Sequence, residues 1–193
     1  MTESVELVFG YPSQVTSETP HNHCLETVLK CIDEAKHSIS IWVYMFNSFK
    51  IRNALLDAMQ RNVLVQVLSF DTKDKYCRAI LDYLLTNEIE VRRARADDQD
   101  SGQSHIKMMI IDENQILVTG SFNFTHAASA KNDEMVIVVR QNTTVVNKAL
   151  AHFQCKWNKS TRVRKLPKKK KSGKSSKKKS DSNKSIRKKS STS

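Results

Sequence analysis

The sequence predicts an α/β fold in which a mixed, largely parallel β-sheet is sandwiched by helices. Stretches rich in β-branched and aromatic residues alternate with amphipathic stretches of 12 to 15 residues, and strands that alternate with helices of this length indicate βαβ units. Several of the strand stretches are continuous apolar runs, which is typical of strands buried on both faces. The 193 residues suffice for one domain with a single hydrophobic core.

The first half of the chain is predicted to alternate strands with helices. Residues 5–9 form a short strand that ends before Gly10 and Pro12. In residues 22–36 the apolar side chains recur at helical spacing, so this stretch is predicted to be an amphipathic helix. By the same criteria, the next elements are a strand (38–46), a helix (51–62), a strand (63–70), a helix (75–87) and a strand (89–94).

The second half is predicted to begin with a surface loop, because residues 95–103 are polar and contain a glycine. Two apolar runs follow, residues 108–111 and 116–118, and they predict a hairpin that turns at residues 112–115. The remaining predicted elements are a short helical stretch (125–130), a strand (134–139) and a final helix (144–159).

The positive charge is concentrated at the end of the chain. The formal net charge is +12, but residues 159–193 contain 16 Lys and Arg and one acidic residue, so they carry +15 and leave −3 for residues 1–158. This end is rich in Lys and Ser and has few apolar side chains, which predicts a disordered tail after a folded domain of residues 1–158. Lysine blocks of this kind bind polyanions or act as nuclear-import signals. A tail that only improves solubility is the alternative.

The cysteines and the N-terminal residues indicate an intracellular protein. The four cysteines, Cys24, Cys31, Cys77 and Cys155, form no CxxC pair, which favours free thiols in a reducing compartment. The first residues lack the pattern of a signal peptide, and no apolar run is long enough to span a membrane. We therefore expect a cytoplasmic or nuclear location. A mitochondrial surface stays open if an anchor precedes residue 1.

Polar side chains stand at the open end of the predicted hairpin. Side chains alternate faces along a strand, so His105 and Lys107 share a face before the first strand, and Ser121 and Asn123 share a face after the second. This set suits a phosphate diester, because the ammonium offsets charge on the phosphoryl oxygens while the hydroxyl and amide groups hold them. No carboxylate cluster with metal-ligand spacing accompanies the set, so we expect no metal, with the lysine in the place of a divalent ion.

The order of these residues resembles a known signature. His105-Ile106-Lys107, Asp112, Gly120-Ser121 and Asn123 are similar to the HKD motif of the phospholipase D superfamily. The likeness extends over about residues 5–157. It is greatest to the small, single-motif branch that contains the Nuc-type endonucleases and the Zucchini or mitochondrial cardiolipin hydrolase proteins.

The resemblance implies a metal-independent, two-step cleavage of a phosphodiester without a cofactor. It assigns His105 as the nucleophile that forms a phosphohistidine, Lys107 and Asn123 as phosphate ligands, and Ser121 as an assisting residue. Glu134 matches a carboxylate that orients and charges the histidine. Asp112 and Gly120 are implied to be structural.

The resemblance also implies a homodimer. The family uses a second motif histidine to protonate the leaving group, and this chain has one motif. The second histidine would then come from His105 of another copy, with the site on the two-fold axis of an isologous interface.

Two departures from the family pattern limit the comparison. Seven residues separate Asp112 from Gly120 where the family usually has six, so the hairpin turn is one residue longer, which a turn or bulge absorbs. Zucchini-type members also carry a Cys/His zinc module. The candidates for one in this chain are His21, His23, Cys24 and Cys31, which we interpret as core or surface residues rather than zinc ligands.

Three functions stay open at this point. The favoured one is an endonuclease on single-stranded nucleic acid, because the basic tail would concentrate a polyanion and no membrane segment is visible. The alternative is a phospholipase D that acts on cardiolipin or another anionic phospholipid, with the tail on the membrane surface. The third is an inactive module that binds nucleic acid.

Overall fold

The described residues form one eight-stranded sheet with helices on both faces. The computed structural model describes residues 2–10, 23–70, 73–94 and 103–163. The strands are β1 (Ser4–Gly10), β2 (Ser38–Val43), β3 (Leu64–Phe70), β4 (Glu90–Ala94), β5 (Lys107–Ile111), β6 (Ile116–Gly120), β7 (Glu134–Arg140) and β8 (Thr161–Arg162). The helices are α1 (His23–Glu34), α2 (Phe49–Gln60), α3 (Lys75–Thr86), α4 (His126–Ala130) and α5 (Thr143–Lys159).

The sheet is mixed, as predicted, but the prediction that it is largely parallel is wrong. The strand order is β1-β7-β6-β5-β2-β3-β4-β8, and only the pairs β2–β3 and β3–β4 are parallel. Parallel neighbours need a crossover, which α2 and α3 provide. The strands β5, β6 and β7 are instead joined by a short turn and by a connection that holds only the short helix α4, and they pair antiparallel.

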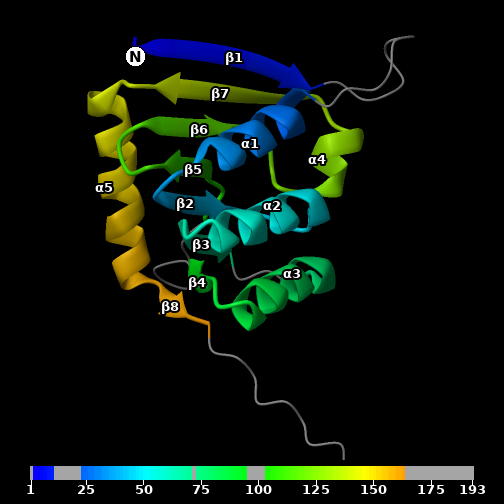
Figure 1. Cartoon of the computed structure of the whole chain (residues 1–193). Coiled ribbons are helices and arrows are strands. Elements are labelled where there is room, and N and C mark those ends of the chain that lie inside the picture. The colour runs from blue at the N-terminus through cyan, green and yellow to red at the C-terminus, as the bar shows by residue number, and fades with distance from the viewer. Residues whose placement is uncertain (1, 11–22, 71–72, 95–102, 164–193) are drawn as a thin grey trace, which may run out of the picture.

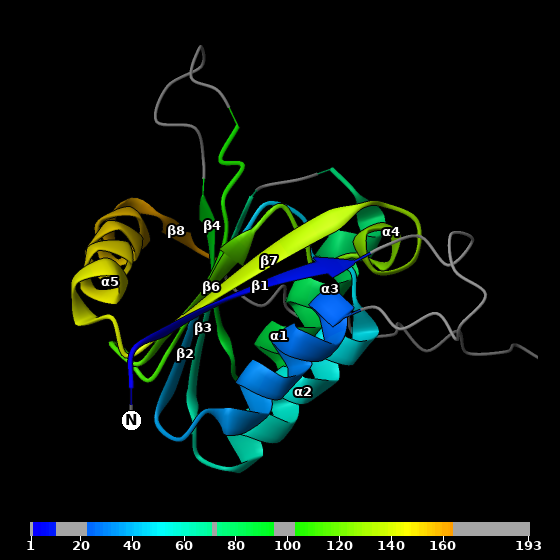
Figure 2. The same ribbon diagram turned by 90° about the horizontal axis from the view of Figure 1, so that it is seen from above.

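Two hydrophobic clusters hold the layers together and confirm the predicted sandwich. The helices α1, α2 and α3 cover one face of the sheet and α5 covers the other (Figure 2). The larger cluster joins the first three helices to the sheet through side chains such as Ile32, Leu55 and Leu84, which are fully buried. The smaller cluster joins the sheet to Phe153 and Trp157 of α5.

Several helices begin at the end of the sheet where the strands β2 and β3 finish. The N-terminal ends of α1, α2 and α3 and the short helix α4 lie together at this end of the strands (Figure 1). Side-chain caps begin α2 and α3: the Ser48 hydroxyl accepts a hydrogen bond from the N–H of Ile51, and the Asp74 carboxylate accepts one from the N–H of Cys77. The strands β2 and β3 end here because each is followed by a helix that carries the chain back.

At the opposite end of the strands, the predicted turn of the hairpin is present, and Asp112 stabilises the structure there. Its backbone φ is 50°, in the left-handed region that Asp tolerates well. Its carboxylate accepts hydrogen bonds of 2.7 to 3.2 Å from the backbone N–H groups of Lys36, His37 and Ser38. The longer hairpin turn is thereby tied to the connection between α1 and β2.

The element boundaries differ modestly from the predicted ones. The strand predicted for residues 38–46 ends at Val43, although Phe46 still bridges to Phe124. The two-residue strand β8, which pairs with β4, was not predicted. It lies beyond the predicted domain end at residue 158, so the fold continues to Val163, whose N–H donates to Val91. The remainder of the predicted tail, from residue 164, and the predicted loop at 95–102 lie outside the described residues.

No helix within the described ranges combines the length and apolar composition that a membrane span requires.

The four cysteines are free thiols, as predicted, and they differ sharply in accessibility. Cys24, Cys31 and Cys77 are buried, and burial raises the pKa of each thiol to about 11, whereas Cys155 is exposed. Because the thiolate is the reactive form, we expect Ellman's reagent at pH 8 to label one thiol per native chain rapidly and four after unfolding in guanidinium. A Cys155→Ser variant should lose the rapid reaction. Rapid labelling of that variant would show that a helix layer opens readily.

Candidate active site

The predicted site residues meet where β5 begins, β6 ends and β7 begins. Lys107 is the first residue of β5, and His105 stands two residues before it. Gly120 ends β6, and Glu134 begins β7. Because β5, β6 and β7 pair antiparallel, these points lie at the same end of the strands. The predicted hairpin is therefore present, and the predicted site residues lie at its open end, which we call the polar rim.

His105 and Lys107 form a close pair. The Lys107 Nζ lies 2.7 Å from Nδ1 of His105 and donates a hydrogen bond of 2.7 Å to the His105 carbonyl oxygen. The His105 ring packs on the ring of Tyr44, with 4.4 Å between the centroids. Lys107 is only 8% exposed. The ammonium is thus held inside the rim, directly beside the imidazole.

Ser121 and Glu134 form a second pair. The Ser121 hydroxyl donates to Oε2 of Glu134 at 2.5 Å and accepts from the N–H of Met135 at 3.0 Å. The other carboxylate oxygen of Glu134 accepts from the Asn132 amide at 3.2 Å. These bonds satisfy a carboxylate that is 8% exposed. In a single chain Glu134 thus holds Ser121 and Asn132, and the role of orienting His105 stays a prediction.

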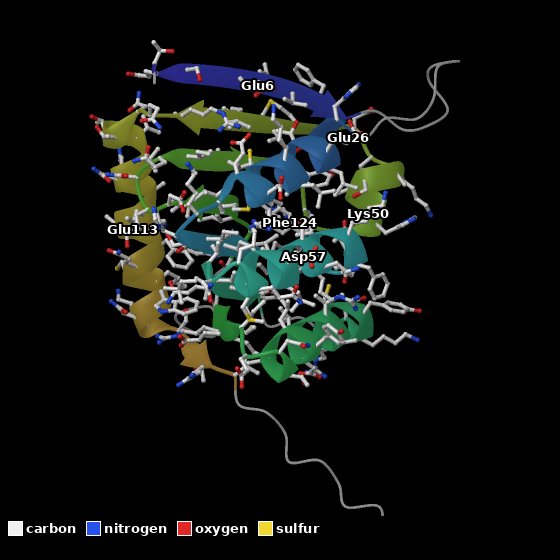
Figure 3. The ribbon with its side chains drawn as sticks, viewed as in Figure 1. Glu6, Glu26, Lys50, Asp57, Glu113 and Phe124 are labelled. Carbon is white, nitrogen blue, oxygen red and sulfur yellow. The ribbon has the colours of Figure 1, made fainter. Side chains whose placement is uncertain are left out.

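Asn123 is held between two buried aromatic residues. Phe122 and Phe124 on either side of it are 2% and 3% exposed and belong to the larger core cluster, and Phe124 lies in the interior of the molecule (Figure 3). The Asn123 Oδ1 accepts a weak hydrogen bond of 3.4 Å from the N–H of Met45. The alternation sends the aromatic side chains into the core, so Ser121 and Asn123 point away from it.

Tyr44 belongs to the site but was predicted only as part of a buried strand. Its hydroxyl donates to Oε1 of Gln103 at 2.7 Å, and the Trp42 indole N–H donates to the Ser104 hydroxyl at 2.7 Å. Both contacts hold the segment that leads into His105. The sequence does show a tyrosine directly after the apolar residues of this strand. Placing that tyrosine beside His105, however, requires knowing that β2 pairs with β5.

Burial affects the charge of Lys107. It lowers the pKa of the ammonium from 10.5, and the nearby Glu134 carboxylate acts in the opposite direction and raises that pKa. The net direction is downward, so the protonated lysine destabilises the folded state relative to a lysine in water.

We expect Lys107 to make the free energy of unfolding depend on pH. Below the lowered pKa both the folded and the unfolded chain hold the proton, and the penalty is fully present. As pH rises towards 10.5 only the unfolded chain keeps the proton, so the wild type should gain stability relative to Lys107→Met. Urea denaturation at several pH values between 8 and 10.5 measures the difference. The exposed Lys50→Met should run parallel to the wild type, and parallel curves for Lys107→Met would contradict the expectation.

The four residues considered as zinc candidates do not form a cluster in the described part of the chain. No group of three or more His, Cys, Asp or Glu residues there could hold a metal ion. The Cys24 thiol donates to the carbonyl oxygens of Val8 and Glu134, and Cys31 lies 3.6 Å from the Arg140 guanidinium. His23 is 3.7 Å from Glu26, and His21 lies outside the described residues.

Comparison with known proteins gives consistent relatives. The phospholipase D of Rickettsia bellii is 37% identical over 124 residues, which are 64% of this chain and 59% of the relative. The mitochondrial cardiolipin hydrolase of Mus musculus is 29% identical over 147 residues, which are 76% of this chain and 64% of the relative. The chain therefore spans about 60% of the length of these curated relatives.

Solved structures give the same picture. Nuc from Salmonella typhimurium, a phospholipase D family member, superimposes with a TM-score of 0.71 at 29% identity and covers 84% of this chain and 99% of its own. NucT from Helicobacter pylori has a TM-score of 0.69 at 20% identity, with 84% and 100% covered, which shows the fold alone. The family model described as "Cardiolipin synthase, PLD-like domain" matches residues 28–157, which is well over half of the sequence and includes the whole polar rim. The chain belongs to this family of PLD-like domains, within the phospholipase D superfamily.

Proposed function

We propose that the protein is a phosphodiesterase, and that it acts as an endonuclease on single-stranded nucleic acid. The observation that carries the proposal is the His105–Lys107 pair, in which a buried ammonium lies 2.7 Å from an imidazole at the rim of the sheet. An imidazole beside a fixed positive charge suits attack on a phosphate diester, because the ammonium offsets the charge on the phosphoryl oxygens.

The proposed reaction has two displacement steps. A ring nitrogen of His105 attacks phosphorus, a P–N bond forms, and the bond to the leaving oxygen breaks as that oxygen takes a proton from His105 of the partner copy. Water then attacks phosphorus and gives a proton to the partner histidine, a P–O bond forms, and the P–N bond to His105 breaks. Lys107 stabilises the charge on the phosphoryl oxygens in both steps, Asn123 holds those oxygens, and Ser121 assists by holding Glu134 in place.

A homodimer completes the site in this proposal. The sequence contains one His-x-Lys motif, so a second histidine must come from another copy. An apolar strip supports an interface close to the site. Val5, Leu7 and Phe9 of β1 are 67%, 54% and 45% exposed. Val5 and Leu7 pair with Val139 and Ile137 and so share the face of α5, and Gly10 at the end of β1 pairs with Glu134.

We expect the wild type to scatter light as a particle of about twice the 22.1 kDa of one chain. Leu7→Glu places a charge in the strip and should give a monomer that has lost phosphodiesterase activity. Glu6→Ala, on the same strand but the other face, should leave the dimer intact. An active wild-type monomer would refute the shared site.

The substrate class is supported by charge. Residues 159–193 carry +15 on the intact chain, and such a segment raises the affinity for a polyanion by counterion release. The names of the relatives, phospholipase D and mitochondrial cardiolipin hydrolase, favour a second candidate, an anionic phospholipid.

A parallel assay of the full chain tests the proposal. Single-stranded DNA, single-stranded RNA, cardiolipin vesicles and bis(p-nitrophenyl) phosphate are incubated with the protein, with and without excess EDTA. We expect cleavage of an oligonucleotide and of the chromogenic diester that EDTA does not reduce. Cleavage of cardiolipin alone would favour the second candidate. Loss of all activity in EDTA with recovery in magnesium would contradict the mechanism.

A further inference from the structure

Three large aromatic side chains are exposed on two neighbouring helices beside the site. Phe49 at the start of α2 is 62% exposed, Tyr76 at the start of α3 is 59% exposed, and Tyr83 further along α3 is 43% exposed. Isolated exposed apolar residues are ordinary, but a group of large rings on adjacent elements indicates a binding surface. None of these rings is used by the proposed reaction.

Each of these rings has a cation against it. The Arg52 guanidinium carbon lies 4.9 Å from the centroid of the Phe49 ring and 4.3 Å from that of Tyr83. The Lys75 ammonium lies 5.0 Å from the centroid of Tyr76. We call the group the aromatic–basic surface, and its members are Phe49, Lys50, Arg52, Lys75, Tyr76 and Tyr83.

A groove of about 690 Å³ lies along one side of this surface. Leu25 and Leu29 of α1 line it together with Phe49 and Tyr76. Charged and polar side chains also line the groove: the charged ones are Lys50 at the start of α2 (Figure 3) and Glu26 of α1, whose carboxylate is 3.7 Å from His23, and His126 of α4 adds an imidazole. The volume is in the range of pockets that hold a small organic group such as a nucleoside.

The groove is joined directly to the predicted phosphate ligands. The backbone N–H groups of Asn47 and Ser48 both donate to the Phe124 carbonyl oxygen at 2.9 Å, and Asn47 Oδ1 accepts from the N–H of His126. Phe124 follows Asn123 in the chain, and Phe49 follows Ser48. The lining of the groove and the segment that carries Asn123 are therefore direct neighbours.

We propose that the aromatic–basic surface binds the nucleotides on one side of the scissile phosphate of a single-stranded nucleic acid. Bases stack on Phe49 and Tyr76, and phosphates contact Lys50, Arg52 and Lys75. Stacking on aromatic side chains next to a basic track is the way in which single strands bind without sequence preference. This inference rests on the proposed nuclease function and extends it from the reacting phosphate to its neighbours.

The alternation of charge and ring favours a nucleic acid over a lipid tail. A single strand presents bases and phosphates in turn, which matches rings that each stand next to a cation. An acyl chain has no charged group along its length, so it would have to pass Arg52 and Lys75 without compensating their charges.

Binding of a fluorescein-labelled oligothymidine of about 20 nucleotides tests the proposal, with fluorescence anisotropy on the full chain in a His105→Asn background that prevents turnover. The double variant Phe49→Ala/Tyr76→Ala removes two stacking rings and should bind at least about 30-fold more weakly. Leu64→Ala is the matched control, because Leu64 is also 62% exposed but stands at the start of β3, at the end of the strands opposite to the site. Lys50→Gln/Lys75→Gln should reduce the slope of log affinity against log salt by about 1.4, whereas the aromatic double variant should leave that slope unchanged.

Further arms separate this inference from the proposed function. Bis(p-nitrophenyl) phosphate carries no neighbouring nucleotides, so the aromatic double variant in an otherwise wild-type chain should lose much less of its rate on this compound than on the oligonucleotide. If the wild type does not cleave this compound, the phosphodiesterase proposal fails, while the anisotropy result still decides the inference. Oligonucleotide binding within twofold of the control variant would overturn the inference. So would a loss of cardiolipin-vesicle binding that leaves oligonucleotide binding intact.

Discussion

His105→Asn is expected to lower kcat/KM for bis(p-nitrophenyl) phosphate by at least about 10⁴-fold, because the asparagine amide cannot attack phosphorus or exchange the proton of the leaving group. In the proposed dimer each replaced histidine removes both a nucleophile and an acid. The side chain of Asn is close to imidazole in size, so the packing against Tyr44 should largely survive. Initial rates at 400 nm, with circular dichroism to verify folding, measure the effect.

His37→Asn is the matched control, because His37 is an exposed histidine near Asp112, at the end of the strands opposite to the site. It should retain wild-type rates. A mixed dimer gives a sharper result: with one His105→Asn subunit and one wild-type subunit it still lacks half of the histidine pair, so it should also be nearly inactive. A mixed dimer with half of the wild-type activity would show that each chain works alone.

Gly120→Ala is expected to reduce the free energy of unfolding by about 3 to 5 kcal/mol. The backbone φ of Gly120 is 151°, which L side chains rarely adopt, and a Cβ there would lie 2.1 Å from the Met135 carbonyl oxygen. Relief requires β6 and β7 to move apart, and the Ser121–Glu134 hydrogen bond spans these two strands. Urea denaturation and the phosphodiesterase rate should therefore both be affected.

Asn62→Ala separates the two causes of that loss. Asn62 also has a positive φ, 66°, in the left-handed region that Asn tolerates better than Ala does, so the substitution adds a backbone cost, but Asn already carries a Cβ and no new atom meets a carbonyl. We expect a loss of about 1 kcal/mol and no change in activity. Equal effects of the two substitutions would show that the close approach to Met135 is unimportant.

The elements of this fold were predictable where their signal is local. Helical periodicity in residues 22–36 gave α1 within two residues at each end, and the apolar runs around residues 112–115 gave the hairpin of β5 and β6. Strand order is not local. Five of the seven strand pairs are antiparallel, and three of these, β1–β7, β2–β5 and β4–β8, join segments far apart in the chain, so no nearby residues encode them.

The same distinction applies to the candidate site. His105 and Lys107, or Ser121 and Asn123, share a face because of alternation along one strand, which can be read from the sequence. Tyr44 lies some 60 residues from His105 in the chain and reaches it only through the pairing of β2 with β5, so it was missed. The resemblance supplied Glu134, whose bonds to Ser121 and Asn132 depend on how β7 begins next to the end of β6.

The two edge strands of the sheet differ in length and in exposed side chains, and this affects how the protein should be handled. The edge strand β8 has only two residues, and one of them is Arg162. Short, charged edge strands resist edge-to-edge aggregation. The other edge strand, β1, has seven residues, and its Val5 and Leu7 side chains are exposed. In the proposed dimer that long edge would be covered, so a variant that separates the subunits would expose it and be prone to form intermolecular sheets at high concentration. A charged substitution such as Leu7→Glu should therefore give a soluble monomer where Leu7→Ala would precipitate.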